Sequence, residues 1–212
     1  MSKPIYLFST SSHPQAININ SLDIKYLKPK IDFSNYDYLI ITSKQSSESL
    51  KQYDREDFIN IPALSVSTQS ALSYEKLGGK ILDIGGGYGD NLISKIKSFP
   101  KSTKWLYLRA KIVASDFVEL CREDGYEIDE AILYESSCSE EIMNLNIEEE
   151  SILIFTSPSS VRCFLKNHTI HKKSKVIVIG KTTAAALGEE IEYTISEKTT
   201  VESCLVAAKR KL

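Results

Sequence analysis

Residues 39–50 read Leu-Ile-Ile-Thr-Ser-Lys-Gln-Ser-Ser-Glu-Ser-Leu, and residues 153–165 read Leu-Ile-Phe-Thr-Ser-Pro-Ser-Ser-Val-Arg-Cys-Phe-Leu. Each stretch is a short apolar run, then Thr-Ser, then a segment rich in hydroxyl side chains. An apolar run followed by a Ser or Thr N-cap predicts a buried strand that turns directly into a helix. The sequence therefore predicts one βα unit in two copies.

A second pair of similar units follows the first. Residues 64–72 read Leu-Ser-Val-Ser-Thr-Gln-Ser-Ala-Leu, and residues 177–187 read Ile-Val-Ile-Gly-Lys-Thr-Thr-Ala-Ala-Ala-Leu. The distance along the chain from copy to copy is nearly the same for both pairs. We therefore expect two similar lobes, each of a usual domain size.

Short apolar runs without strict alternation alternate with helical patterns along the chain, which is typical of an α/β fold with parallel sheets flanked by helices. Two extended segments interrupt this order, and we expect them to pair as a two-stranded antiparallel ladder that joins the lobes. The predicted boundaries are a discontinuous lobe of residues 1–20 plus 138–212, an inserted lobe of residues 35–125, and a ladder of residues 21–34 and 126–137.

Composition restricts the function. The chain has 212 residues, 42% hydrophobic and 25% charged, with a net charge of -2, so we expect no nucleic-acid partner. No apolar run is long enough for a membrane span, and the first residues are typical of a strand rather than a signal peptide. We therefore expect a cytoplasmic monomer. Four scattered cysteines without a Cys-x-x-Cys pair and only three histidines predict reduced thiols and no metal site.

A glycine loop, Asp83-Ile-Gly-Gly-Gly-Tyr-Gly89, follows a predicted strand and resembles the cofactor loop of S-adenosylmethionine-dependent methyltransferases. In that family the loop follows the first strand, whereas three strands precede it here. The next strand ends in Arg109, where an acidic residue should bind the ribose hydroxyls. We therefore favour a plain tight turn and keep a methyltransferase as the alternative function.

Hydroxyl side chains gather at four predicted helix starts. Ser157-Pro158 is an N-cap followed by proline at the first helical position, and Gly180-Lys-Thr-Thr opens a helix expected over residues 182–190. Helix N-termini present unpaired N–H groups that bind carboxylates or phosphates, and in parallel sheets they lie where ligands usually bind. These starts predict a site for an anionic small molecule.

The ordered motifs resemble the uroporphyrinogen-III synthase family over essentially the full length. The resemblance rests on five segments: Ile40–Ser46, Ile154–Val161, Val178–Leu187, Ile132–Ser136 and Leu106–Ala110. It implies an enzyme of tetrapyrrole (heme) biosynthesis, a hydro-lyase that cyclises linear hydroxymethylbilane to uroporphyrinogen III. Water is lost, the last pyrrole ring is inverted, and no cofactor or metal is implied. Because the substrate is a polycarboxylate, it suits the many helix starts.

The resemblance also implies roles for single residues. Tyr134 is the candidate catalytic acid, as a hydrogen-bond donor to the leaving hydroxyl. The chain departs from the family pattern at Lys44, where proline is usual, and at Ser67, where glycine is usual.

A non-catalytic two-lobe receptor for a carboxylated ligand is a further alternative function. The candidate substrate-binding residues are Thr182, Thr183, Lys181, Ser157, Ser159, Thr42, Ser43, Ser67 and Arg109.

Overall fold

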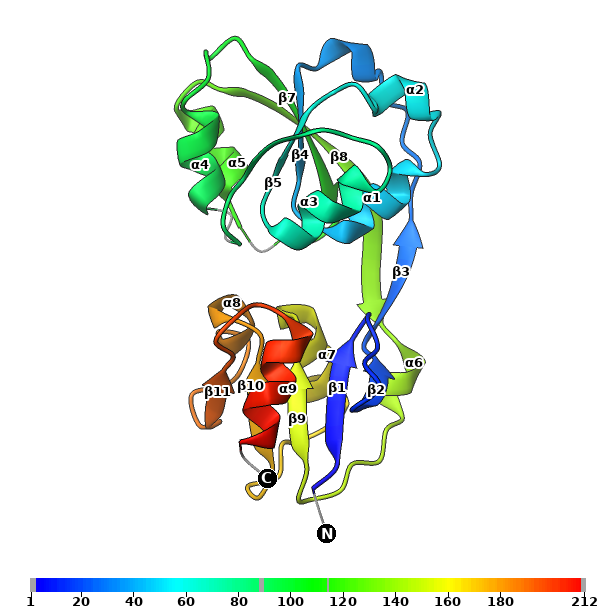
Figure 1. Ribbon diagram of the computed structural model, residues 1–212, viewed down its shortest axis with the longest axis vertical. Helices are drawn as coiled ribbons and strands as arrows, with labels where there is room; N and C mark the ends of the chain where they lie inside the picture. The colour runs from blue at the N-terminus through cyan, green and yellow to red at the C-terminus, as the bar shows by residue number, and fades with distance from the viewer. Residues whose placement is uncertain (1–2, 88–89, 114, 211–212) are drawn as a thin grey trace. The chain divides into compact units, whose positions relative to one another are not determined.

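The computed structural model describes residues 3–87, 90–113 and 115–210. The chain forms two compact units: unit 1 comprises Met1–Asp23 and Ser137–Leu212, and unit 2 comprises Ile24–Ser136. The chain crosses from one unit to the other within strand β3 (Leu22–Tyr26) and near the end of strand β8 (Glu127–Cys138). Each unit is built around its own sheet (Figure 1).

The sheet of unit 1 has five strands in the order β11-β10-β9-β1-β2, and all neighbours are parallel. The central strands are almost wholly buried, because helices cover the sheet and the runs are apolar throughout. The strands are β1 (Ile5–Ser9), β2 (Ile17–Asn20), β9 (Ile152–Phe155), β10 (Lys175–Val178) and β11 (Tyr193–Ile195).

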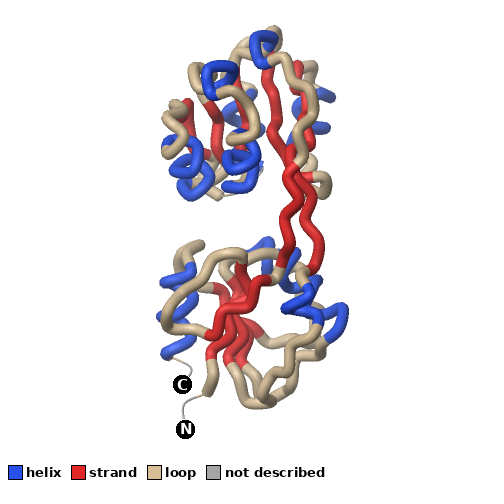
Figure 2. Tube along the Cα trace, turned by 90° about the vertical axis from the view of Figure 1, so that its right-hand side faces the viewer, coloured by secondary structure: helices blue, strands red, loops and turns tan. Residues whose placement is uncertain are grey.

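The second sheet has six strands in the order β3-β8-β7-β4-β5-β6. Its pairs are parallel except at the β3 edge, where the arrows of β3 and β8 point in opposite directions in Figure 1. Figure 2 shows these two strands running side by side. The predicted α/β class with parallel sheets and an antiparallel ladder is therefore confirmed. The remaining strands are β4 (Tyr38–Ile41), β5 (Ala63–Ser65), β6 (Ile81–Ile84) and β7 (Lys104–Ala110).

The helices follow the strands. Those of unit 1 are α6 (Glu140–Met143), α7 (Pro158–Asn167), α8 (Lys181–Ala184) and α9 (Val201–Lys209). Those of unit 2 are the 3-10 turn η1 (Phe33–Asn35), α1 (Lys44–Leu50), α2 (Arg55–Phe58), α3 (Thr68–Glu75), α4 (Asp90–Ile96) and α5 (Phe117–Glu123). No helix in the described ranges is long and apolar enough to cross a membrane.

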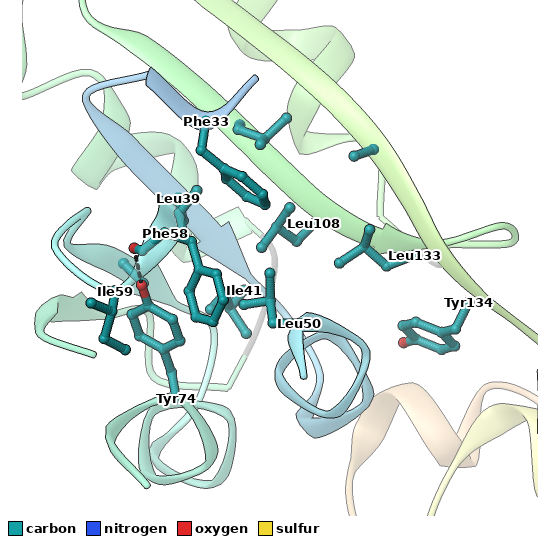
Figure 3. Packing of buried hydrophobic residues seen from close by; sticks show 13 residues of the cluster. Phe33, Leu39, Ile41, Leu50, Phe58, Ile59, Tyr74, Leu108, Leu133 and Tyr134 are labelled. Carbon is teal, nitrogen blue, oxygen red and sulfur yellow. Dashed lines mark hydrogen bonds between the residues drawn. The ribbon is translucent and has the colours of Figure 1, made fainter. Parts of the chain in front are cut away.

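Each sheet has an apolar cluster on both faces. One cluster of unit 2 contains Phe33, Phe58 and Tyr74 and reaches the ladder at Leu133 and Tyr134 (Figure 3). The buried Tyr74 hydroxyl donates a hydrogen bond to the Phe58 carbonyl at 3.0 Å, so this polar group is not left unsatisfied in the core. The packing thus continues from the helices of unit 2 to the strand that carries the candidate acid.

Two expectations of the sequence are wrong. The helix expected over residues 182–190 ends at Ala184, because the next turn tightens: Ala186 N bonds the Thr183 carbonyl and Leu187 N bonds the Ala184 carbonyl, before Gly188. The thiols expected to be reduced include Cys138 and Cys163, which form a disulfide with 5.3 Å between their Cα atoms. The fold causes this pairing, since it brings the end of β8 beside α7.

Candidate functional site

The strands of unit 1 end in one row at the carboxyl edge of their sheet. Phe8 of β1 pairs with Phe155 of β9. Phe155 pairs in turn with Val178 of β10, and Val178 pairs with Ile195 of β11. The segments that follow these residues therefore meet at this edge, where ligands of parallel sheets usually bind. The edge carries Ser157, Ser159, Lys181, Thr182 and Thr183.

Most hydroxyls at the start of α7 stabilise the helix itself. Ser157 Oγ accepts from Ser160 N and Ser160 Oγ accepts from Ser157 N, each at 3.1 Å, which makes a capping box with Pro158 at the first helical position. The Thr156 hydroxyl donates to a backbone carbonyl of β1 at 3.1 Å. Ser159 is half-buried, and its hydroxyl bonds no other described residue. Ser159 is therefore the hydroxyl of this turn most open to a ligand.

The start of α8 has no side-chain cap. Gly180 is the N-cap residue, and the first internal bonds run from Thr183 N and Ala184 N to the Gly180 carbonyl. Within the described ranges, the amides of Lys181 and Thr182 bond no backbone carbonyl, so both can donate to an anion. The Thr182 side chain is exposed, whereas Thr183 is only 3% exposed. This turn presents backbone amides, one hydroxyl and one ammonium group.

Unit 2 has a similar edge. Leu108 of β7 pairs with Ile41 of β4, which pairs with Ser65 of β5. The residues after these positions form the corresponding row, again at the carboxyl ends of parallel strands. The sequence-predicted residues at this edge are Arg109, Thr42, Ser43 and Ser67.

The hydroxyls of this edge are bonded to tyrosines as well as to helix amides. Ser43 Oγ caps α1 by accepting from Gln45 N at 3.1 Å, and Ser67 Oγ caps α3. The Thr42 hydroxyl lies 2.9 Å from the Tyr107 hydroxyl, and either can donate. Burial raises the pKa of Tyr107 to about 12, so this phenol is neutral at physiological pH.

A β-bulge places Tyr134. Arg109 of β7 pairs with Ile132 of β8, but the next residue, Ala110, pairs with Tyr134, so Leu133 is the extra residue. Both Leu133 and Tyr134 consequently pack in the same apolar cluster, although neighbours in a regular strand point to opposite faces (Figure 3). The Leu133 carbonyl accepts hydrogen bonds from Ser49 Oγ at 2.8 Å and from Leu27 N at 2.8 Å.

The bulge turns the Tyr134 hydroxyl toward α1. The side chain is 8% exposed, and Figure 3 shows its hydroxyl pointing toward α1. Its side-chain hydrogen-bond partner at the helix start is Ser43. Burial raises the pKa of Tyr134, while the bond with Ser43 lowers it to a smaller extent. The side chain is therefore a protonated phenol at neutral pH, held beside a helix N-terminus, and it has a proton or a hydrogen bond to donate.

Arg109 is held by an ion pair on unit 2. Its Nη1 lies 3.0 Å from Glu130 Oε1, and Arg122 Nη1 lies 3.0 Å from Glu130 Oε2. Two guanidinium groups therefore share one carboxylate, which leaves a net positive charge. The Arg109 Nε is buried and has no partner among the described residues. Arg109 thus adds to a positive potential at this edge rather than acting as a free cation.

The glycine loop is a turn whose amides are largely occupied. Gly85 N donates to the Ser65 carbonyl at 2.7 Å, and Gly87 N donates to the Val66 carbonyl at 2.6 Å. Gly86 and Gly87 have φ values of 71° and 102°, which favour glycine. Tyr88 and Gly89 lie outside the described residues. The loop follows β6, the edge strand of its sheet, and its glycines satisfy the turn.

Sequence reasoning missed two parts of these edges. Tyr107, which bonds Thr42, was treated only as part of a strand. The loop of residues 10–13 (Thr-Ser-Ser-His) follows β1, which lies beside β9, so its hydroxyls join the edge of unit 1. Strand order could not be read from the sequence, and only the order places β1 next to the Thr-Ser strand.

Comparison with known proteins decides the family. The family model described as uroporphyrinogen-III synthase HemD matches residues 15–206, which is most of the chain. The chain belongs to the uroporphyrinogen-III synthase family. Its structure is similar to that of uroporphyrinogen-III synthetase from Helicobacter pylori 26695, with a TM-score of 0.82, 26% identity, and coverage of 99% of this chain and 100% of that chain.

Other comparisons agree on the fold of this uroporphyrinogen-III synthase family member. A mutant uroporphyrinogen III synthase from the extremely thermophilic bacterium Thermus thermophilus is 15% identical with a TM-score of 0.63, covering 92% of this chain and 88% of that chain. No curated protein matches the sequence. The family assignment replaces the methyltransferase alternative, in agreement with the occupied amides of the glycine loop.

Metal ligation finds no support in the side chains that the structure describes. Among them, no group of three or more His, Cys, Asp or Glu residues is placed to hold an ion. Many hydroxyls and acids of the two edges are instead bonded to backbone, tyrosine or arginine. What the edges present is hydrogen-bond donors for carboxylates and two buried phenols, those of Tyr107 and Tyr134.

Proposed function

We propose that this chain cyclises linear hydroxymethylbilane to uroporphyrinogen III, with loss of water and inversion of the last pyrrole ring, as a hydro-lyase of heme biosynthesis. Membership of the uroporphyrinogen-III synthase family supports the reaction. The structural observation that carries the proposal is Tyr134: a bulge and Ser43 fix a buried, protonated phenol at a strand edge rich in hydrogen-bond donors.

The proposed acid step begins at the substrate hydroxymethyl group. Tyr134 donates its proton to the leaving hydroxyl, the carbon–oxygen bond breaks, and water departs. The protonated, electron-poor azafulvene that remains is attacked by the substituted carbon of the last ring, which forms a spiro intermediate. The old bond from this carbon to its methylene bridge then breaks, and the freed methylene carbon bonds the unsubstituted carbon of the same ring. The proton that this carbon loses as the pyrrole regains aromaticity returns to the Tyr134 phenolate. The proton count therefore balances without a cofactor.

The proposed binding step is orientation of the chain. Thr182, the amides of Lys181 and Thr182, and Ser159 are donors for substrate carboxylates in unit 1. Ser157 and Thr183 contribute mainly through backbone amides, because one hydroxyl caps its helix and the other side chain is buried. The remaining proposed contacts, on unit 2, are Thr42, Ser43, Ser67 and Arg109.

The substrate can close its ring with or without inversion of the last pyrrole. Holding this flexible chain in one geometry allows only one of the two closures. Uncatalysed closure joins the ends without inversion and gives the type I isomer. The proposed donors fix the carboxylates of the last ring so that its substituted carbon, rather than its free carbon, faces the azafulvene. Isomer identity is therefore the direct readout of this orientation.

The test is an assay in which hydroxymethylbilane is supplied and the products are separated into type I and type III isomers. We expect type III to dominate with the wild-type chain and type I in buffer alone. A matched control is Tyr36→Phe, which removes a unit 2 phenol that bonds Asp129 near the start of β8. Absence of type III above the spontaneous level contradicts the proposal.

We also propose that the protein acts as a cytoplasmic monomer. Membership of a family of tetrapyrrole-biosynthesis enzymes supports the location. The Cys138–Cys163 disulfide is instead typical of an oxidising compartment, because such bonds are rare in the cytosol. Thiol alkylation in intact cells distinguishes these cases: Cys138 and Cys163 react there only if the disulfide is open, as expected in the cytoplasm, and their protection contradicts that location. Gel filtration of the protein should give a monomer mass, and a larger mass contradicts the monomer.

A further inference from the structure

A second tyrosine lies beside Tyr134. β3 is antiparallel to β8, and Leu27 N donates to the Leu133 carbonyl at 2.8 Å, so the preceding residue, Tyr26, lies across from Tyr134. Ile24, two residues earlier in the chain, packs on the same apolar cluster as Tyr134, which places Tyr26 on that face of the ladder. The Tyr26 side chain is 40% exposed, whereas Tyr134 is buried.

Tyr26 and Tyr134 both bond to the first turn of α1. The Tyr26 hydroxyl donates to Gln45 Oε1 at 2.6 Å. Tyr134 bonds Ser43, whose Oγ in turn accepts from Gln45 N at 3.1 Å. Gln45 is therefore fixed through its backbone by Ser43 and through its side chain by Tyr26, next to the candidate acid.

The bond from Tyr26 leaves the other end of the Gln45 amide available. A primary amide has one acceptor oxygen and two N–H donors on nitrogen. Because the oxygen accepts from Tyr26, the Nε2 group is turned away from that phenol, and it bonds no other described residue. Gln45 is half-buried, so its donors are partly shielded from water, which strengthens a bond to an anion.

We propose that Gln45 Nε2 donates a hydrogen bond to a carboxylate of the substrate, and that Tyr26 is the positioning residue that orients this amide. The inference rests on the proposed function and assigns two residues to the same site. Neither residue was among those predicted from the sequence. The pair supplies a neutral donor for a carboxylate close to the point where Tyr134 acts.

Three variants test the pair in the isomer-resolved assay. Gln45→Glu has nearly the same shape but presents oxygen instead of N–H, so we expect KM to rise about tenfold or more with kcat little changed. Gln45→Leu removes the donor without adding charge and should raise KM less. Tyr26→Phe keeps the ring but frees the amide, and its KM should rise severalfold.

Coupling between the residues separates positioning from a general structural role. Tyr26→Phe combined with Gln45→Leu should have the KM of Gln45→Leu alone, because Tyr26 acts only through the amide. The matched control, Tyr36→Phe, removes another phenol hydroxyl of unit 2 and should keep the wild-type KM. Thermal melting of each variant confirms that the fold is kept.

The outcomes separate this inference from the proposed function. If the wild-type chain makes type III and Gln45→Glu keeps the wild-type KM, the inference is wrong and the proposed function stands. If the wild-type chain makes no type III, the proposed function is wrong, and the pair is tested with uroporphyrin III, a stable polycarboxylate, by fluorescence titration. Weaker binding by Gln45→Glu than by Tyr36→Phe supports the pair, and equal binding overturns it.

Discussion

Unit 1 and unit 2 open corresponding helices with the same Thr-Ser dipeptide, but the hydroxyls have different partners. In unit 1 the Thr156 hydroxyl bonds a backbone carbonyl at 3.1 Å, and Ser157 completes a capping box. In unit 2 the Thr42 hydroxyl lies 2.9 Å from that of Tyr107, and Ser43 bonds Tyr134 while it caps α1. The same dipeptide therefore bonds its own helix and a neighbouring strand in unit 1, whereas in unit 2 it also holds two phenols.

This difference gives the two units different roles in the proposed reaction. Unit 2 fixes Tyr134, the proposed proton donor to the leaving group. Among the described residues of unit 1, no tyrosine lies at a helix start, and the uncapped turn at Gly180 presents amides and Thr182. Two copies of one βα unit thus give two sheet edges with the same Thr-Ser dipeptide. In the proposed reaction, the side chains next to that dipeptide assign the acid to unit 2 and the carboxylate donors mainly to unit 1.

The two units also differ in what stabilises them, and the disulfide of unit 1 gives the largest expected effect. The Cys138–Cys163 bond closes a loop over a sequence separation of 25. By the chain-entropy relation, its loss in Cys163→Ser lowers the free energy of unfolding by about 3–4 kcal/mol. Urea unfolding followed by circular dichroism measures this, and reductant should destabilise the wild type but not the variant. Equal stability of oxidised and reduced wild type contradicts the comparison.

High pH should act on unit 2 through its buried phenols. The pKa of Tyr107 is raised to about 12, and that of Tyr134 is also raised. The folded state favours the neutral phenol, so its contribution is complete below the unfolded pKa of about 10 and is lost as pH rises from about 10 to about 12. For Tyr107 the loss amounts to about 2–3 kcal/mol.

Trp105, the single tryptophan, lies in unit 2, and its fluorescence reports this loss. Urea midpoints measured with it should fall steeply above about pH 10. The Tyr107→Phe variant should show a shallower fall. Midpoints that do not change with pH up to about 12 would mean that the phenols are not buried in the folded state.

Removing a helix cap should have the smallest effect on stability. The losses in the two units show which helix start is capped more strongly. Ser157→Ala removes a capping box and should cost about 1–2 kcal/mol of stability. Ser67→Ala removes a cap bond of 3.3 Å from Ser70 N and a bond of 3.0 Å to the Ser70 hydroxyl, and should cost about 0.5–1 kcal/mol. Thermal or urea melts of both variants measure the order. A larger loss of stability in Ser67→Ala than in Ser157→Ala would contradict the stronger cap inferred for α7.

The sequence predicted the parts of the structure that depend on local signals. The Thr-Ser helix starts at Ser43 and Ser157 are capped as expected, because a serine oxygen reaches the amide two or three residues later in any such turn. Apolar runs predicted parallel strands for the same local reason. Strand β2 (Ile17–Asn20) was missed, since Asn alternates with Ile at a sheet edge and leaves no apolar run.

Features that depend on distant residues were not predictable in this way. The Cys138–Cys163 bond requires the end of β8 to lie beside α7, and no spacing rule indicates that contact. The bulge at Leu133 depends on the register between β7 and β8, and regular alternation would place Tyr134 on the opposite face. The candidate acid was therefore identified from the family resemblance, while its orientation required the structure.

The most direct test of the proposed roles, an acid on unit 2 and carboxylate donors on unit 1, compares Tyr134→Phe with Thr182→Ala in the isomer-resolved assay. For Tyr134→Phe we predict that kcat for type III formation falls about 10²–10⁴-fold with KM nearly unchanged, because an acid acts in the transition state. For Thr182→Ala we predict a KM about tenfold higher with kcat nearly unchanged, because a donor to a carboxylate is lost. Full kcat in Tyr134→Phe, or the same parameter changing in both variants, would contradict the account.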